Sequence, residues 1–241
     1  MYTDSSTARE KPFAPSRLTG RAPGSSASHI VVLAASAFLL SACQPQTAPP
    51  PAAASVEIVP EPGWRSSASA EDLARVDAIG SAWIEALTTA RRRFARQVEA
   101  EGALLDPEAA LPFPAPTPGN YMCRWIRLGS NEEGARAFIA YRSFFCFIGA
   151  EGDLLSLTKQ TGSDRPSGYL FEDGSRRMIF LGTLALGDES APLAYGEDPS
   201  RDIAGSLERV GSFRFRLVIP RPRSGALLEV IELTPAPVQN D

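Results

Sequence analysis

Lys159 and the serines near it in the sequence could form a catalytic pair, with serine as nucleophile and lysine as base. Ser156, Ser163 and Ser167 lie within eight residues of Lys159. A Ser–Lys pair can attack an acyl group when the lysine is desolvated and its pKa falls towards neutral. The sequence alone shows no burial of Lys159, and an Arg-rich codon bias also explains why lysine is rare in this chain. The Ser–Lys arrangement is therefore one alternative among three.

Carboxylates form a second group, which could hydrolyse glycans. Such chemistry needs two carboxyl groups about 5–9 Å apart, one as acid and one as base or nucleophile. Most of the acidic candidates lie beside Gly or Pro, where Asp and Glu also favour turns for backbone reasons. The candidates are Glu172/Asp173, Asp188/Glu189, Glu197/Asp198, Asp202 and Glu208.

Two polar loops form the third group. Residues 196–202 offer oxygen ligands for a hard cation such as calcium, although their spacing does not match an EF-hand. Residues 161–165 offer backbone N–H groups and a guanidinium that could hold a carboxylate or phosphate. Arg–Asp pairs that only pin the loops explain both equally well. The candidate ligand-binding residues are Lys159, Ser163, Arg165, Asp198, Arg201 and Asp202. No metal site and no cofactor is expected.

Several classes of chemistry are excluded by composition. The chain has 241 residues and one histidine, His29, which lies in a segment expected to be removed. The sequence therefore excludes a Ser–His–Asp triad and a His-containing zinc site in the folded domain. It contains no P-loop, no GxSxG elbow and no dinucleotide fingerprint. The net charge of -4 argues against a nucleic-acid partner, because such domains usually carry a basic excess.

The N-terminal segment has the pattern of an export signal. Basic residues precede an uncharged, mostly apolar run over 30–40, which is too short to span a membrane and suits a signal peptide. Leu40-Ser41-Ala42-Cys43 then resembles the lipobox of bacterial lipoproteins. This resemblance implies a lipid anchor on Cys43, and Gln44 after it favours the outer membrane. The protein is expected to face the periplasm of the bacterial envelope.

Cys123 and Cys146 remain as an even pair once Cys43 is lipidated. They lie in two neighbouring candidate strands, and the periplasm is oxidising, so a structural disulfide is the favoured interpretation. A redox or metal pair is the alternative, although no CxxC motif or histidine stands nearby.

Composition and periodicity predict the regions of the chain and the secondary structure that carries these residues. The predicted regions are a signal peptide over 1–42, a Pro/Ala-rich tether over 43–63, a helix and Pro-rich arm over 64–118, an antiparallel β region over 119–235 and a disordered tail over 236–241, with 64–235 as one domain. Ser69 followed by Asp72 resembles a capping box, and apolar residues at helical spacing predict one long helix that ends at Gly102.

The remainder of the domain has the alternation of strands. Phe213, Phe215, Leu217 and Ile219 share one predicted face, opposite Arg214 and Arg216. The predicted strands cover 120–128, 137–148, 153–160, 167–172, 176–186, 203–210, 212–219 and 226–233. The expected fold class is α+β, a long N-terminal helix followed by an antiparallel meander closed or nearly closed into a barrel.

Several longer stretches are distinctive beyond composition. They are Gly119–Arg124, Lys159–Tyr169, Phe180–Gly182, Tyr195–Gly205 and Phe213–Pro222. Together they resemble a bacterial family, domain of unknown function 4893, over roughly residues 64–233. The resemblance implies a single domain in a secreted or lipoprotein setting, and no activity.

The function expected from these observations is non-catalytic. The leading hypothesis is an envelope binding or structural module that holds a small ligand, a glycan or an envelope protein, because small barrels can hold one ligand. A carboxylate-dependent envelope hydrolase is the alternative. A periplasmic protease inhibitor built on a small barrel is the second alternative, and it rests on analogy of fold.

Overall fold

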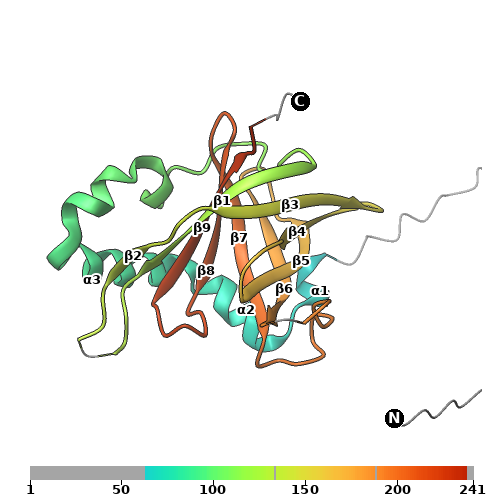
Figure 1. The fold of residues 1–241 in the computed structure, drawn as a ribbon, viewed down its shortest axis with the longest axis horizontal. Coiled ribbons are helices and arrows are strands. Elements are labelled where there is room, and N and C mark those ends of the chain that lie inside the picture. Colours follow the sequence, from blue (N-terminus) through green and yellow to red (C-terminus); the bar gives the residue numbers. More distant parts are fainter. Residues whose placement is uncertain (1–62, 133, 188, 238–241) are drawn as a thin grey trace, which may run out of the picture. The chain divides into compact units, whose positions relative to one another are not determined.

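A closed antiparallel β-barrel dominates the computed structural model, which describes residues 63–132, 134–187 and 189–237. Within these residues eight strands form the barrel, and β1 pairs with β9 to close it (Figure 1). The strands are β1 (Gly119–Leu128), β3 (Phe144–Glu151), β4 (Leu154–Lys159), β5 (Asp164–Glu172), β6 (Arg177–Leu186), β7 (Asp202–Gly211), β8 (Arg214–Pro220) and β9 (Leu228–Pro235). The predicted closed meander is confirmed.

The segment over 137–148 differs from the single strand that the sequence predicts. It forms a short strand β2 (Phe138–Ala140) and then β3, and the two pair with different parts of β1. The signal peptide, the lipidation site Cys43, most of the tether and the end of the C-terminal tail lie outside the described residues.

Alternation along the strands fills the barrel interior. On β8, Phe215, Leu217 and Ile219 point inward together, as the pattern predicts, whereas Phe213 precedes the strand and is exposed. The disulfide between Cys123 and Cys146 is confirmed, and it joins β1 to β3 inside this interior cluster. The interior is a packed apolar core rather than a channel.

The predicted single long helix is wrong. The segment instead contains α1 (Trp64–Ser67), α2 (Ala70–Asp77), α3 (Ile79–Ala100) and the 3-10 turn η1 (Gly102–Leu105). Ser69 does cap α2 by accepting a hydrogen bond from the Asp72 backbone N–H (3.1 Å). Helical geometry is interrupted at Ala78 and again at Phe94, whose ring stacks on Phe138 of β2. The break at Ala78 separates α2, which contacts β7, from α3, which contacts β8 and β9. The fold is mostly β.

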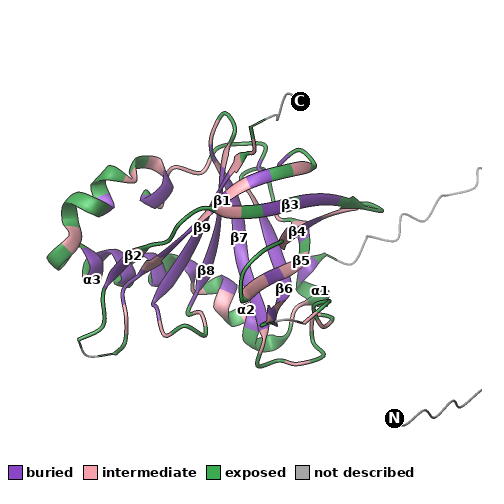
Figure 2. Cartoon of the chain, viewed as in Figure 1, coloured by how far each residue is buried: buried purple, intermediate pink, exposed green. Residues whose placement is uncertain are grey.

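The helices cover one side of the barrel. Helix α2 contacts β7, and α3 contacts β8, β9, β1 and β2. The strands under the helices are buried on both faces. Figure 2 shows that β7 and β8 are buried along most of their length, whereas β3 carries exposed positions. The outer faces of β6 to β9 therefore belong to a second apolar core, which Trp83 and Val76 of the helices complete.

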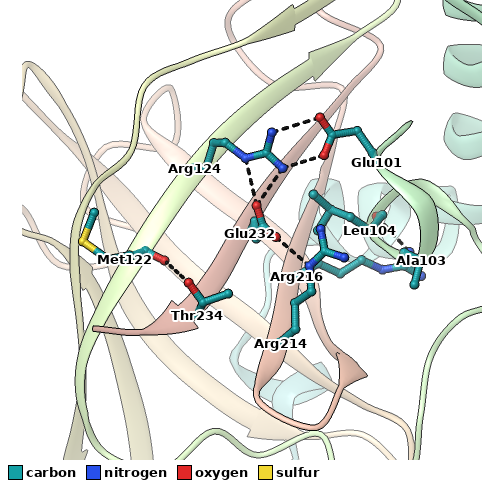
Figure 3. A network of polar contacts seen from close by, with 9 residues as sticks. All are labelled: Glu101, Ala103, Leu104, Met122, Arg124, Arg214, Arg216, Glu232 and Thr234. Carbon is teal, nitrogen blue, oxygen red and sulfur yellow. Dashed lines mark hydrogen bonds and ion pairs between the residues drawn. The ribbon is translucent and has the colours of Figure 1, made fainter. Parts of the chain in front are cut away.

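A polar network attaches the end of α3 to the barrel wall (Figure 3). Arg124 of β1 binds Glu101 through Nη2 (2.5 Å) and Glu232 of β9 through Nε (2.8 Å). Arg214 of β8 donates to the other oxygen of Glu232 (2.6 Å). These outward-facing ion pairs tie α3 to β1, β8 and β9.

Replacing Gly205 with alanine is expected to lower the free energy of unfolding by about 1–3 kcal/mol. A Cβ at Gly205 in β7 would lie 2.3 Å from the carbonyl oxygen of Val218 in β8, so the two strands would have to separate. Urea unfolding measures the loss. Gly80→Ala is the matched control: nothing lies within 4 Å of its added Cβ, and alanine favours a helix by about 0.5–1 kcal/mol. Equal stability of the two variants would contradict this account of the strand contact.

Candidate functional site

One end of the barrel opens into a pocket of about 240 Å³. This end is formed where β1, β4, β6 and β8 finish and where β5, β7 and β9 begin. We call it the mouth pocket. Its lining residues are Arg75, Trp125, Arg127, Asp164, Leu184, Leu186, Asp202, Ile203, Ala204, Ile219, Pro220, Arg221, Pro222, Arg223, Ser224 and Glu229. It combines an apolar wall with charged groups at the rim.

A buried ion pair stands at the inner edge of the mouth pocket. Arg127 on β1 and Glu229 on β9 are direct cross-strand partners, and their Nε and Oε1 atoms are 2.5 Å apart. Arg127 also donates to the hydroxyl of Tyr141 (2.9 Å). Burial opposes the charge on Arg127, but Glu229 and Tyr141 together outweigh it and raise the pKa of Arg127 above its ordinary value. The guanidinium is thus a permanent cation inside the barrel.

The turn between β8 and β9 supplies the basic rim. Arg221 lies between two prolines with a φ of 47°, a conformation that non-glycine residues seldom adopt and that often marks a functional site. Its Nη2 donates to Glu85 of α3 (2.6 Å). Arg223, two residues on, makes no ion pair or side-chain hydrogen bond with any residue that the structure describes. Arg223 is exposed at the rim of the pocket, within electrostatic reach of Asp198.

Trp125 supplies the apolar wall together with Leu184, Ile203 and Ile219. Only 8% of Trp125 is exposed, and its indole N–H has no hydrogen-bond partner among the described residues. A buried donor without a partner costs about 1–3 kcal/mol. The indole nitrogen is itself shielded from solvent, so this N–H does not face the open part of the pocket.

Lys159 lies next to this wall. Its Nζ is 5.2 Å from the centre of the Trp125 ring and 4.7 Å from that of Phe144, and it donates to the carbonyl oxygen of Asp164 (2.6 Å). Burial lowers the pKa of Lys159. Its position brings a second cation to the neighbourhood of Arg127.

Two of the other candidate residues, Ser163 and Arg165, hold the loop between β4 and β5. The carbonyl of Ser163 accepts the Gly187 N–H (3.0 Å), and Arg165 donates to the carbonyls of Gly187 and Glu189 (both 2.5 Å). Each contact ties this loop to the loop that follows β6.

Asp198 and Arg201 lie in the loop before β7, and Asp202 is the first residue of that strand. Arg201 binds Glu189 (2.7 Å) and Asp198 (3.1 Å), and Oδ1 of Asp202 accepts the Gly196 N–H (3.1 Å). Of the six candidate residues, Asp202 is the one that reaches the mouth pocket itself. The pairs pin a long loop, as one of the two sequence-based interpretations proposes.

The carboxylate pairs considered for hydrolysis are dispersed. Asp173 accepts from the indole of Trp64 (2.9 Å) and Glu208 pairs with Arg216 (2.7 Å), both away from the pocket. Asp188 lies outside the described residues. Among the described residues, no three Asp, Glu, Cys or His side chains come together as a metal site.

Most of the described chain matches one protein family. A family model described as a domain of unknown function (DUF4893) matches residues 64–233. The chain belongs to this family. The match confirms the resemblance found in the sequence, and it includes every residue that lines the mouth pocket. No curated protein and no solved structure matches the chain. In the part of the chain that is described, no helix is long and apolar enough to cross a membrane.

The DUF4893 pocket contains residues that sequence reasoning missed, chiefly Trp125, Arg127, Arg223 and Glu229. One signal was available. Alternation on β1 places Arg127 on the same inward face as Cys123 and Trp125, so a charged residue ends an otherwise apolar face. The pairing of Arg127 with Glu229 was not accessible, because 102 positions separate them.

Asp202→Asn in this DUF4893 chain is expected to be more stable than the natural protein at neutral pH. Burial raises the pKa of Asp202, so folding favours its protonated form, and this contribution is lost as the pH rises through the folded-state pKa. Asparagine keeps an oxygen that can accept the Gly196 N–H. Urea unfolding at several acid pH values should show that the difference in free energy of unfolding between the variant and the natural protein shrinks as the pH falls. A variant that is less stable at neutral pH would mean that the ionised carboxylate is the preferred form.

Proposed function

We propose that the protein is a non-catalytic binding module of the bacterial envelope, held by a lipid on Cys43 in the outer membrane and facing the periplasm, with a small ligand in the mouth pocket. The observation that carries the proposal is the pocket itself. It opens at one end of a barrel whose interior is otherwise packed, and inward positions of several strands converge on it. Its volume of about 240 Å³ suits a small molecule.

A carboxylate hydrolase receives less support from the same site. Glu229 is engaged by Arg127 (2.5 Å), and Asp202 is engaged by the Gly196 N–H (3.1 Å). Hydrolysis requires two carboxyl groups that are free to face a substrate bond. In a binding role both carboxylates can keep these contacts. Glu229 then orients Arg127, and Asp202 holds the loop that contains Gly196. No contact among the described residues specifically favours the protease inhibitor.

Native mass spectrometry of the full chain, produced with its own N-terminal segment in a bacterium and gently purified, tests the binding role. A co-purifying small mass is expected. Ser224→Trp should displace it, because Ser224 is exposed and lines the pocket. Ser175→Trp is the matched control, since Ser175 lies in the exposed turn between β5 and β6, away from the pocket. A bare mass for the natural protein would contradict the proposal.

The anchor has its own test. Cys43→Ser removes the sulfur that would carry the lipid, so the protein is expected to move from the membrane fraction to the soluble fraction of the envelope. Acyl chains contribute about 0.8 kcal/mol for each buried CH₂, and losing them should shift nearly all of the protein. Fractionation followed by immunoblotting measures the shift, with Ser175→Trp in the exposed turn between β5 and β6 as control. A variant that stays with the membrane would show that Cys43 is not the anchor.

A further inference from the structure

We propose that the end of the barrel opposite the mouth pocket rests on the lipid bilayer, with the rings of Phe113 and Phe213 inserted at the membrane surface. We call this end, where β5 and β7 finish and β6 and β8 begin, the far end. The proposal rests on the lipid anchor of the proposed function, and it names the face of the domain that meets the membrane. The mouth pocket then faces away from the membrane.

The far end carries the two most exposed large apolar side chains among the described residues. Phe113 is 83% exposed and Phe213 is 73% exposed. Phe213 lies in the turn between β7 and β8, and Phe113 lies in the Pro-rich arm that crosses the same end, where the N–H of Leu111 donates to the carbonyl of Arg209 in β7 (2.8 Å). Exposed apolar groups that gather on one surface mark contacts with proteins or membranes, and phenylalanine inserts at the boundary between head groups and acyl chains.

The backbone holds Phe113 in a conformation that a bulky residue seldom adopts. Its φ is 60°. Its N–H donates to the carbonyl of Ser175 (2.9 Å), and Nε of Arg209 donates to the carbonyl of Pro112 (2.9 Å). Strain of this kind persists where the surrounding contacts fix it, and it often marks a functional position. The arm thus holds an exposed ring in one place, which lowers the entropy cost of inserting it.

The described chain begins beside the same turn that Phe113 contacts. The indole N–H of Trp64 donates to Asp173 (2.9 Å), and Asp173 and Ser175 both lie in the turn between β5 and β6. Cys43 precedes Gly63 by 20 positions, and a chain of that length reaches about 70 Å at most when fully extended. A lipid on Cys43 therefore keeps the rings at a high effective concentration near the bilayer, so that a weak contact is enough to orient the domain.

Charged groups of both signs surround the two rings. Arg176 donates to the carbonyl of Ala110 in the arm (3.4 Å), and Arg209 donates to that of Pro112. Glu108 of the arm and Glu172 at the end of β5 are exposed at the same end. The attraction to the membrane is therefore assigned to the apolar rings, and it is expected to persist at about 0.5 M salt, where interactions between exposed charges are screened.

Tryptophan fluorescence in vesicles of brominated phosphatidylcholine tests the proposal, because bromine on the acyl chains quenches nearby indoles. The full chain is purified from bacterial membranes in detergent and reconstituted, and the natural protein supplies the background of its three buried tryptophans. Phe113→Trp and Phe213→Trp are each expected to lose about half of the added emission, since an inserted ring lies within about 10 Å of the acyl chains. Ile84→Trp is the matched control, because Ile84 is 71% exposed on α3. Ser224→Trp reports on the mouth, and neither control should be quenched.

Flotation of the same vesicles separates this proposal from the anchor on which it rests. Natural protein that floats while Phe113→Trp and Phe213→Trp stay unquenched would overturn the membrane contact, leave the anchor intact and favour a protein partner for the rings. Natural protein that does not float would overturn the anchor and the membrane contact together. Equal quenching of Ile84→Trp or Ser224→Trp would show a domain without a fixed orientation, and quenching that is lost at high salt would show attraction by charge. Either result would also overturn the proposal.

Discussion

Replacing Arg216 with methionine is expected to lower the free energy of unfolding by about 3–5 kcal/mol, the largest effect of any single substitution considered for this protein. Arg216 on β8 is fully buried, and it pairs with Glu208 of β7 through Nη2 (2.7 Å). Its Cζ lies 5.0 Å from the centre of the Trp83 ring of α3. Removing the cation would leave the Glu208 carboxylate buried without its partner.

Arg216 also binds the segment that follows α3. It donates to the carbonyl oxygens of Ala103 (3.1 Å) and Leu104 (3.1 Å) (Figure 3). It also donates to those of Asp106 (2.6 Å) and Pro107 (3.3 Å). These carbonyls belong to η1 and the start of the Pro-rich arm, so Arg216 fastens this segment to β8. Adding Glu208→Leu to Arg216→Met should therefore not restore stability, although replacing both members of a buried pair often does.

Urea unfolding followed by circular dichroism measures the effect of Arg216→Met. Arg221→Met is the matched control, because its pair with Glu85 is nearly half exposed on both sides and should contribute about 0–1 kcal/mol. A loss below about 1 kcal/mol for Arg216→Met would show that the buried network does not hold the helices to the barrel.

Removing the disulfide is expected to lower the free energy of unfolding by about 3 kcal/mol. The bond joins residues 23 positions apart, and it restricts the unfolded chain across a loop of that length. Cys123 and Cys146 are fully buried in the barrel interior, so their replacement by alanine also removes apolar packing. The pair lies on adjacent strands β1 and β3, where β2 branches from the same edge of β1.

Reductant supplies an internal control for this prediction. In urea, added reductant should lower the unfolding midpoint of the natural protein to near that of Cys123→Ala/Cys146→Ala, and it should leave the midpoint of the variant unchanged. Without urea the bond should resist reduction, because both sulfur atoms are buried. A double variant as stable as the natural protein would mean that the cross-link adds nothing to the fold.

Much of the β architecture could be predicted because its signals are local. Alternation over Phe215, Leu217 and Ile219 defines an inward face wherever the strand lies. The cap at Ser69 depends on a residue three positions away. The prediction of a single long helix failed for the opposite reason, since the helices pack on strands far along the chain, α2 on β7 and Phe94 of α3 on Phe138 of β2.

The candidate site was less predictable. The polar loops are rich in Asp, Arg and Gly, a composition that suggests a ligand site. In the structure Arg165 and Arg201 instead hold those loops in place. The pocket instead depends on Trp125, Arg127 and Arg223, which look ordinary in sequence. Trp125 has a buried indole N–H without a partner among the described residues, and Arg127 pairs β1 with β9 where the barrel closes. Arg223 lines the mouth of the barrel.

The sequence by itself determined the strand pattern, the cysteine pair that forms the disulfide and the family, because each depends on residue types at short spacing or on motifs in a fixed order. The tertiary structure alone decided that β1 pairs with β9, that Arg127 meets Glu229, and that one end of the barrel is hollow. Barrel closure sets these contacts between distant segments through strand number and register. A pocket lined by residues of six strands has no counterpart in any one stretch of the chain.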